Sequence, residues 1–257
     1  MPFNFNQKVK LFHTSLLIIF CCLMFCSCHD KVPNSNFQLS LDDYQDLRSS
    51  AYAINSRVVR NLIDSIMRND KDRHAADLHT RRYYQNEGNL LWITRHGVNS
   101  QADSLVTCLR TVADMGFDKR FYVDAIARDI DRLRDLNLDS ADNQINQVIA
   151  RLEYRLTKAY FRYTMGQNFG FMNPSFVFNR LDTLAPNPYD SSKRPVRFRG
   201  LFDVKMAHAD DAFYQKAMQM VRCDSVASFL KEVQPKNPFY YQLLEKLKAG
   251  GLGKAMR

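Results

Sequence analysis

The sequence has few cysteines outside its N-terminal end and little continuous apolar sequence. Four of its six cysteines lie between residues 21 and 28, so only Cys108 and Cys223 remain for a folded part. One bond between these two would be possible in an oxidising compartment, but both lie in helix-like apolar contexts, which favours buried free thiols. The apolar run Leu16 to Phe25 has about ten residues, whereas roughly 20 are needed to span a bilayer. These shortages exclude a disulfide-rich fold and argue against a membrane-spanning helix.

Complete catalytic and metal-binding motifs are also lacking. The sequence contains no H-E-x-x-H, and the five-residue spacing of His74 and His79 keeps them off a common helical face. The stretch "GQNFG" lacks the lysine of a phosphate-binding loop. Residues 228–231 match the S-x-x-K of serine penicillin-binding proteins, but the S-D-N and K-T-G partners are absent, and Phe229 and Leu230 have the character of core residues. We therefore expect no metal and no cofactor.

The N-terminal residues have the pattern of an export signal. Lys8 and Lys10 precede the apolar run, and the small Ser27 precedes Cys28. This ending resembles the lipobox of bacterial lipoproteins, in which the cysteine receives the lipid and becomes the mature N-terminus. An ordinary cleaved signal is the alternative. We expect a lipoprotein-type signal peptide over residues 1–27, lipid attachment at Cys28, a flexible tether over 28–45 and a folded domain over 46–257. The protein would then be lipid-anchored to a membrane of the bacterial cell envelope and face the periplasm.

Apolar residues recur at helical spacing over most of the remaining chain. The longest such segment, residues 142–165, predicts the central helix of a bundle, with Arg151 on its exposed face. Further helices are predicted over 56–69, 100–116 (capped by Ser100), 118–133, 210–220, 224–233 and 238–249. We therefore predict a mainly α fold, an irregular multi-helix bundle with at most a short strand near residues 90–94.

Two features are candidate ligand-binding sites. The first, which we call the basic loop, gathers four cations without an acid: Lys193, Arg194, Arg197 and Arg199. Such side chains bind carboxylates or phosphates, although a solvated charged loop is the alternative. The second is Trp92, which could stack on a sugar, although its apolar neighbours favour a core position. The net charge of +9 indicates anionic envelope polymers, phosphorylated lipids or no specific partner, and we expect no nucleic-acid partner for an exported chain.

Three segments resemble, in the same order, the scaffold domain of the large bacterial murein L,D-transpeptidases. They are residues 88–122, which lead through a tryptophan-containing strand into a helix and turn, the signature helix over 153–182, and the closing element over 226–249. The matching residues are Gly116, Asp118 and Tyr122 in the first segment, Leu156, Thr157, Tyr163, Gly166 and Pro174 in the second, and Pro235, Pro238, Tyr241 and Leu244 in the third. Phe117 replaces the usual leucine. The resemblance implies that residues 46–257 form a scaffold-like helical domain.

Complete members of that family carry a catalytic cysteine in an S-x-G-C-x-R motif, downstream of H-G-T. Its thiolate takes the acyl group from one stem peptide and passes it to the amine of another. Neither Cys108 nor Cys223 lies in such a motif. The resemblance therefore implies a non-enzymatic scaffold that binds peptidoglycan or a peptidoglycan-processing protein. Two alternatives remain open at this point. The chain is the N-terminal fragment of an interrupted L,D-transpeptidase, or it is a serine acyl-transfer enzyme using Ser228 and Lys231.

Overall fold

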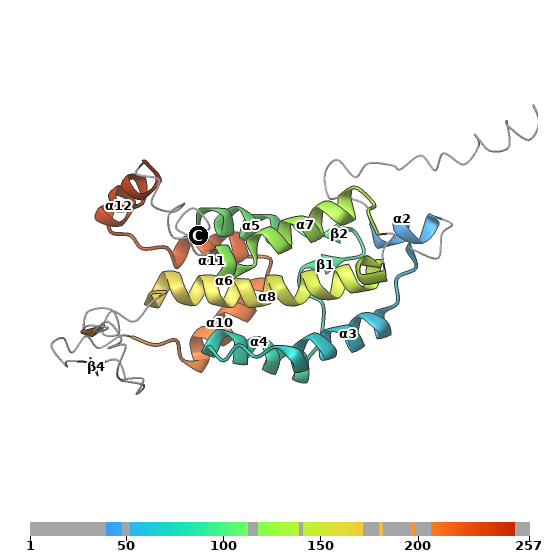
Figure 1. Cartoon of the computed structure of the whole chain (residues 1–257), viewed down its shortest axis with the longest axis horizontal. Helices are drawn as coiled ribbons and strands as arrows, with labels where there is room; N and C mark the ends of the chain where they lie inside the picture. Colours follow the sequence, from blue (N-terminus) through green and yellow to red (C-terminus); the bar gives the residue numbers. More distant parts are fainter. Residues whose placement is uncertain are drawn as a thin grey trace, which may run out of the picture. The chain divides into compact units, whose positions relative to one another are not determined.

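The computed structural model describes residues 40–47, 52–112, 118–138, 141–171, 180–181, 197–198 and 207–249. All of them belong to one unit of the chain, Asn34–Arg257. Helices dominate this unit, and the strands that are described have two residues each (Figure 1). The predicted mainly α fold is therefore confirmed.

Helix α8, Ile145–Phe169, is the centre of the unit, as predicted for residues 142–165. The elements that contact it include α3 (Ser56–Asn69), α4 (Ala75–Asn86), α5 (Ser100–Val112), α6 (Asp118–Phe121), α7 (Val123–Arg134) and α10 (Asp211–Arg222) (Figure 1). Eighteen of the 25 residues of α8 are buried, so its neighbours enclose it on most sides. It ends at Gly170, whose φ of +100° lies in the region that favours glycine.

Helices α3 and α4 follow one another along one side of α8 (Figure 1). The side chain of Asn55 caps α3 by accepting hydrogen bonds from the N–H groups of Arg57 and Val58 at 3.0 and 3.2 Å. The apolar face of α3 points inward through Val59, Ile63 and Met67, whereas the apolar Val58 is 40% exposed. This face joins α3 to the common core.

Between α4 and α5, strands β1 (Ile93–Thr94) and β2 (Gly97–Val98) pair antiparallel. The strand predicted near residues 90–94 is thus one arm of a short hairpin. A second antiparallel pair, which the sequence did not indicate, joins β3 (Arg180–Leu181) to β4 (Arg197–Phe198).

Two helix boundaries differ from the prediction. Asn99 rather than Ser100 caps α5, because its side chain accepts from the N–H of Ala102 at 3.0 Å. Tyr122, expected inside one helix over residues 118–133, has a φ of +56° and separates α6 from α7. A left-handed residue interrupts a right-handed helix. The buried residues of α7 nevertheless recur at helical spacing and include Ile126, Ile130 and Leu133.

The elements at the two ends of the described chain are helical. A 3-10 helix, η3 (Ala141–Asn143), leads into α8, and α10, α11 (Val226–Glu232) and α12 (Pro238–Ala249) lie where three C-terminal helices were predicted.

Helix α2, Leu41–Asp46, begins inside the range expected to be a tether. Tyr44 of α2 is buried and donates its hydroxyl to the carbonyl of Leu133 at 2.6 Å. The packed part therefore begins by Leu41, earlier than expected. Among the described helices, none is both long and apolar enough to cross a membrane.

Candidate functional site

The residues predicted to form sites lie in different parts of the chain. Cys28 and three members of the basic loop, Lys193, Arg194 and Arg199, lie outside the described residues. Arg197 belongs to β4, where its Cα is in register with that of Leu181. Trp92 directly precedes β1, so of these residues it is the one whose side-chain surroundings are described.

Trp92 is a core residue. Its side chain is 0% exposed, and its ring meets that of Tyr160 edge-on with 5.5 Å between the centroids. Its indole N–H donates to the Thr157 hydroxyl at 2.9 Å. A ring without exposed surface cannot stack on a sugar, so the core interpretation of Trp92 is correct and its role as a ligand-binding residue is excluded.

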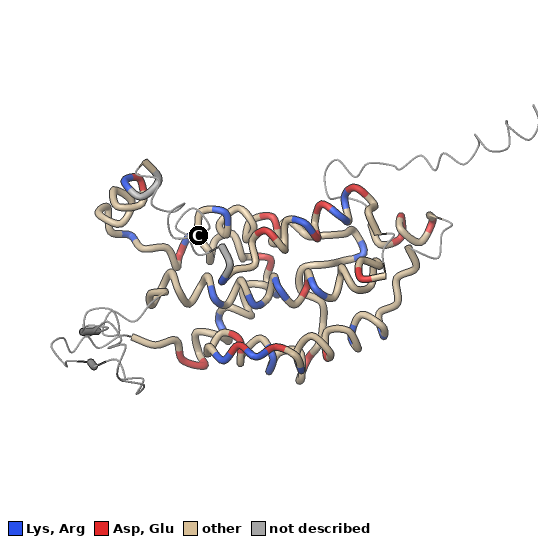
Figure 2. Tube along the Cα trace, in the orientation of Figure 1, with Lys and Arg blue, Asp and Glu red and all other residues tan. Residues whose placement is uncertain are grey.

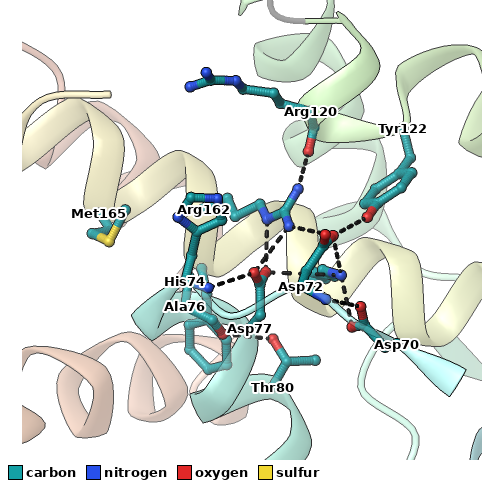
Figure 3. Close-up of polar contacts among 12 residues, drawn as sticks. Asp70, Asp72, His74, Ala76, Asp77, Thr80, Arg120, Tyr122, Arg162 and Met165 are labelled. Carbon is teal, nitrogen blue, oxygen red and sulfur yellow. Dashed lines mark hydrogen bonds and ion pairs between the residues drawn. The ribbon is translucent and has the colours of Figure 1, made fainter. Parts of the chain in front are cut away.

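A buried ion network joins the start of α4 to the middle of α8. Asp77 lies in the first turn of α4, is fully buried, and accepts hydrogen bonds from Arg162 Nε at 2.7 Å and Nη2 at 3.0 Å. Lys158, one helical turn before Arg162, donates to Asp70 at 2.6 Å and to Asp72 at 2.8 Å. Figure 3 shows that the carboxylates of Asp72 and Asp77 both point toward Arg162. The network therefore fixes the α3–α4 connection against the central helix.

Neighbouring side chains extend this network on both sides. The hydroxyl of Tyr122, at the break between α6 and α7, donates to Asp72 at 2.8 Å, and that of Tyr154 donates to Asp70 at 2.8 Å. Arg81 lies 3.4 Å from Asp70. Among the described residues the network thus combines the carboxylates of three Asp residues with two Arg and one Lys, so its charges balance. The helix break at Tyr122 has a structural consequence, because it brings the ring over the network.

The close pairing keeps these groups charged. Hydrogen bonds from Lys158 and then from Tyr122 lower the pKa of Asp72 below its ordinary value, although partial burial opposes this. Burial acts to raise the pKa of Asp70, but its hydrogen bonds, with that from Lys158 the strongest, outweigh burial and lower it. The pKa of Lys158 is raised, because its two carboxylate partners outweigh the effect of its own burial. We interpret this network as a structural clamp, because its charges are already engaged with one another.

Two further buried carboxylates fasten α8 to its neighbours. Glu153 accepts from the backbone N–H groups of Leu91 and Trp92, at 3.1 Å for Trp92, and so holds the chain that leads into β1. Tyr84 of α4 donates its hydroxyl to the same carboxylate at 3.1 Å. Burial raises the pKa of Glu153 to about 7, although the three donors favour the anion. The charge of this buried carboxylate is therefore sensitive to pH changes near neutrality.

Asp129 of α7 is the other buried carboxylate. It binds Arg132 at 2.7 Å, Arg151 at 2.9 Å and Arg155 at 2.8 Å. Arg151 was predicted to occupy the exposed face of α8, and this was wrong. Its side chain is 22% exposed because it reaches back to a buried acid on the adjacent helix.

The sequence contained a signal for these clamps that the prediction did not use. Lys158 and Arg162 are four residues apart in the helix predicted to be the most enclosed, and a charged residue buried in such a position needs a partner. Their acidic partners lie 85 to 90 residues away in the sequence. Periodicity alone cannot identify partners at that separation.

A surface pocket of about 270 Å³ opens between α4 and α10. Its buried lining residues are aromatic or apolar: Tyr83, Phe161, Tyr214 and Met218. Its exposed lining residues include charges of both signs: Arg82, Glu87, Asp211 and Arg222. The pocket thus has an apolar floor and a rim of mixed charge. Figure 2 shows both signs of charge on α4, whereas basic residues recur along α8.

The rim charges form two exposed ion pairs across the pocket. Arg222 of α10 binds Glu87 at the end of α4, and the two side chains are 52% and 46% exposed. Arg82 Nη1 lies 3.5 Å from Asp211 Oδ1, with side chains 61% and 75% exposed. Exposed pairs of this kind contribute only about 0–1 kcal/mol to stability. Exchange of either partner for a ligand group therefore requires little free energy.

His79 lies between the floor and the rim. Its ring stacks on that of Tyr214, with 3.6 Å between the centroids, and Nε2 lies 3.5 Å from Asp211. Burial lowers the pKa of His79, and the nearby charge of Arg82 lowers it further, against the opposing effect of Asp211. At neutral pH the imidazole is therefore mainly neutral and serves as a wall of the pocket.

The described cysteines are free thiols in different surroundings. Cys108 of α5 is half-buried, and this burial raises the pKa of its thiol, although a hydrogen bond with Tyr163 lowers it in part. Cys223 was expected to be buried but is exposed, because it is the C-cap of α10 and lies beyond the apolar face of that helix. Neither thiol lies in the pocket lining.

The S-x-x-K segment lies on α11. Ser228 and Lys231 are exposed, whereas Phe229 and Leu230 between them are buried, as predicted. Among the residues that the structure describes, no cluster of His, Cys, Asp and Glu is arranged to hold a metal ion.

No curated protein and no solved structure is significantly similar to this chain. A family model described as "Scaffold domain" matches residues 77–247, which is more than half of the chain. The match begins at Asp77 of the buried network, includes all residues that line the pocket, and ends in α12. The chain therefore belongs to the scaffold domain family.

Proposed function

We propose that this protein is a non-catalytic scaffold of the bacterial cell envelope, related to the murein L,D-transpeptidases, which binds peptidoglycan or a peptidoglycan-processing protein. The observation that carries the proposal is the scaffold family match over residues 77–247. The resemblance of residues 153–182 and 226–249 to the scaffold domain of those enzymes supports the more specific relationship.

The buried clamps on α8 support a scaffold role. They hold α3, α4 and α7 and the chain leading into β1 against one helix through charged hydrogen bonds. A charge-assisted hydrogen bond is roughly twice as strong as a neutral one. Removing one member of a buried pair typically costs about 3–5 kcal/mol, so the relative positions of these elements are strongly fixed. Such a frame presents its surfaces in a constant geometry.

The chemistry of the described thiols and hydroxyls supports a non-catalytic role. A cysteine transpeptidase requires a thiolate, and the raised pKa of Cys108 keeps its thiol in the unreactive form. Ser228 has Lys231 nearby in sequence, but the S-D-N and K-T-G elements that accompany such a pair in acyl-transfer enzymes are absent from the sequence.

The lipoprotein-type ending at Ser27 and Cys28 supports anchoring to an envelope membrane. We expect mature protein to carry lipid on Cys28 and to fractionate with membranes. Cys28→Ala should release it into the soluble envelope fraction. Mass spectrometry that locates the mature N-terminus at another residue would contradict the anchoring.

The binding function is tested by co-sedimentation with insoluble peptidoglycan. We expect wild type to sediment at low salt and less protein to sediment at high salt, because the Debye length falls from about 10 Å at 0.1 M to about 3 Å at 1 M. Arg197→Ala/Arg199→Ala should weaken sedimentation if the basic loop contributes. The matched control is Arg57→Ala/Arg60→Ala, which removes the same charge from exposed positions of α3.

The outcomes separate the proposal from its rivals. Absence of sedimentation at any salt concentration would remove peptidoglycan as the ligand. Equal losses of sedimentation in both double variants would show that the total positive charge, and not the basic loop in particular, determines binding. Mass spectrometry after carbapenem treatment tests catalysis, because carbapenems trap the cysteine of L,D-transpeptidases. A covalent adduct on Cys108, Cys223 or Ser228 would overturn the non-catalytic role.

A further inference from the structure

The pocket between α4 and α10 has the composition of a ligand site. It combines a buried aromatic floor, which includes Phe161 and Tyr214, with a charged rim, and small-molecule sites characteristically place a few polar groups around an apolar lining. Its volume of about 270 Å³ is close to the lower end of the roughly 300–1,000 Å³ typical of such sites. It therefore suits one or two residues of a peptide rather than a long polymer.

The rim determines which charges that ligand carries. Arg82 and Arg222 supply guanidiniums, and Asp211 and Glu87 supply carboxylates, so the rim offers both signs in equal number. A polyanion would meet two repelling carboxylates here. A ligand with one carboxylate and one ammonium meets a partner for each, because an arginine donates to carboxylates in a fork and an acidic side chain accepts from ammonium.

The two rim pairs are able to open for such a ligand. Both are solvent-exposed, and the 3.5 Å separation of Arg82 from Asp211 leaves most of the donors of that guanidinium unused by Asp211. The stack of His79 on Tyr214 forms a flat wall beside Asp211, against which an aliphatic chain can pack. The apolar floor and the exchangeable rim pairs thus favour a ligand that has an aliphatic chain with a zwitterionic end.

We propose that this pocket binds the zwitterionic end of a short peptide, with the carboxylate at Arg82 or Arg222 and the ammonium at Asp211 or Glu87. This inference rests on the proposed function, and under it the ligand is a peptidoglycan stem peptide. The diamino acid of such a peptide carries an ammonium and a carboxylate on one carbon at the end of an aliphatic chain. Those are the groups that the rim and floor accommodate.

The test is calorimetric titration of the full chain with the synthetic tripeptide L-alanyl-γ-D-glutamyl-meso-diaminopimelate. Replacing the arginine that holds the carboxylate, by Arg82→Gln or by Arg222→Gln, should weaken binding by about tenfold or more, the loss expected for a charge-assisted hydrogen bond. A tripeptide acetylated on the free amine of its diamino acid should bind wild type correspondingly less tightly. Lys216→Gln is the matched control. Lys216 lies on α10, as Arg222 does, but outside the pocket, and it forms an exposed ion pair with Glu232 of α11 at 2.5 Å. Its binding should equal that of wild type.

Thermal unfolding of each variant is measured alongside, and Glu87→Gln provides a second rim variant that leaves both arginines in place. Tripeptide binding that is unchanged by the arginine variants and by acetylation would overturn the pocket proposal. Co-sedimentation with intact peptidoglycan that persists while the tripeptide fails to bind would also overturn it and leave the proposed function standing. Pocket-dependent tripeptide binding without any co-sedimentation would retain the pocket as a peptide site and remove intact peptidoglycan as the ligand of the proposed function.

Discussion

Two regions of this domain use the same ionic chemistry in opposite surroundings. The network around Asp77 and Arg162 is buried between α4 and α8, where each charge has several partners. The pairs around Arg82 and Arg222 lie at the exposed rim of the pocket, between α4 and α10. Helix α4 contributes to both regions. Its first turn carries Asp77 of the buried network, and its last turns carry Arg82 of the rim.

The difference shows how burial determines what an ion pair does. A buried pair gains from the low dielectric of the interior but leaves an uncompensated charge when one partner is removed, so it acts as a clamp. An exposed pair is screened and contributes little to stability, so its members remain available to a ligand. The predictions below test this contrast, beginning with the largest expected effect.

Asp77→Ala should lower the free energy of unfolding by about 3–5 kcal/mol, because it leaves the buried guanidinium of Arg162 without its bidentate partner. Asp211→Ala at the rim removes the same group from an exposed pair and should change stability by less than about 1 kcal/mol. Urea unfolding measures both. Similar losses in the two variants would contradict the contrast.

Leu152→Ala separates clamping from ordinary packing on the same helix. Leu152 is fully buried in α8, so its truncation should lower the free energy of unfolding by about 2–5 kcal/mol. Peptide binding at the pocket should survive in the fraction that remains folded, because Leu152 is not among the pocket-lining residues. Denaturant unfolding monitored by circular dichroism gives the first quantity. A loss below about 1 kcal/mol would show that the core has been misassigned.

Glu153 should make stability fall as pH rises toward neutrality. Its pKa is raised from 4.5 to about 7 in the folded protein, so between these values the folded chain holds a proton that the unfolded chain has released. The contribution is complete below about pH 4.5 and is lost as pH rises through about 7, and the shift corresponds to about 3 kcal/mol.

The measurement is the difference in unfolding free energy between wild type and Glu153→Gln across pH 4.5 to 8. Glutamine cannot ionise, so wild type should lose stability relative to the variant over this range. The comparison also separates Glu153 from Asp70 and Asp72, whose lowered pKa values remove stability only at acid pH. A difference that does not vary with pH would show that Glu153 keeps an ordinary pKa.

The smallest effect concerns the two thiols. Cys223 is exposed, whereas Cys108 is half-buried with a raised pKa. Iodoacetamide should therefore modify Cys223 first under native conditions, and both at similar rates after unfolding. Peptide mapping by mass spectrometry follows the two sites. Faster native modification of Cys108 would indicate an activated thiol and weaken the non-catalytic role.

Much of the fold could be predicted because the helices carry regular apolar stripes. Buried residues of α3, α7 and α8 recur at the predicted helical spacing, although Val58 of α3, expected on its apolar stripe, is 40% exposed, and α12 lies over the residues predicted. The errors concern single residues and short segments, because α2 begins inside the expected tether and the β3–β4 pair was not indicated. Periodicity could not reveal the left-handed turn at Tyr122, whose hydroxyl is hydrogen-bonded to Asp72 on a distant segment of the chain, and it could not distinguish Asn99 from Ser100 as a cap.

The candidate site could be predicted much less well. Arg151 and Trp92 show why. From the sequence, Arg151 was expected on the surface and Trp92 was a candidate for stacking on a sugar. In the structure each has a structural role, because Arg151 pairs with the buried Asp129 and Trp92 is buried and hydrogen-bonded to Thr157. The pocket was not predicted at all. It is formed by residues of α4, α8 and α10, which are far apart in the sequence, and its rim charges resemble any other exposed charges on a helix.

The most direct test of the central claim is a pair of double-mutant cycles on the free energy of unfolding. One cycle uses Asp77→Ala and Arg162→Ala, and the other uses Glu87→Ala and Arg222→Ala. We predict a coupling energy of roughly 2–3 kcal/mol for the buried pair, at the upper end of measured couplings, and below about 1 kcal/mol for the rim pair. Equal coupling energies in the two cycles would contradict the division of this domain into a fixed ionic frame and an exchangeable rim.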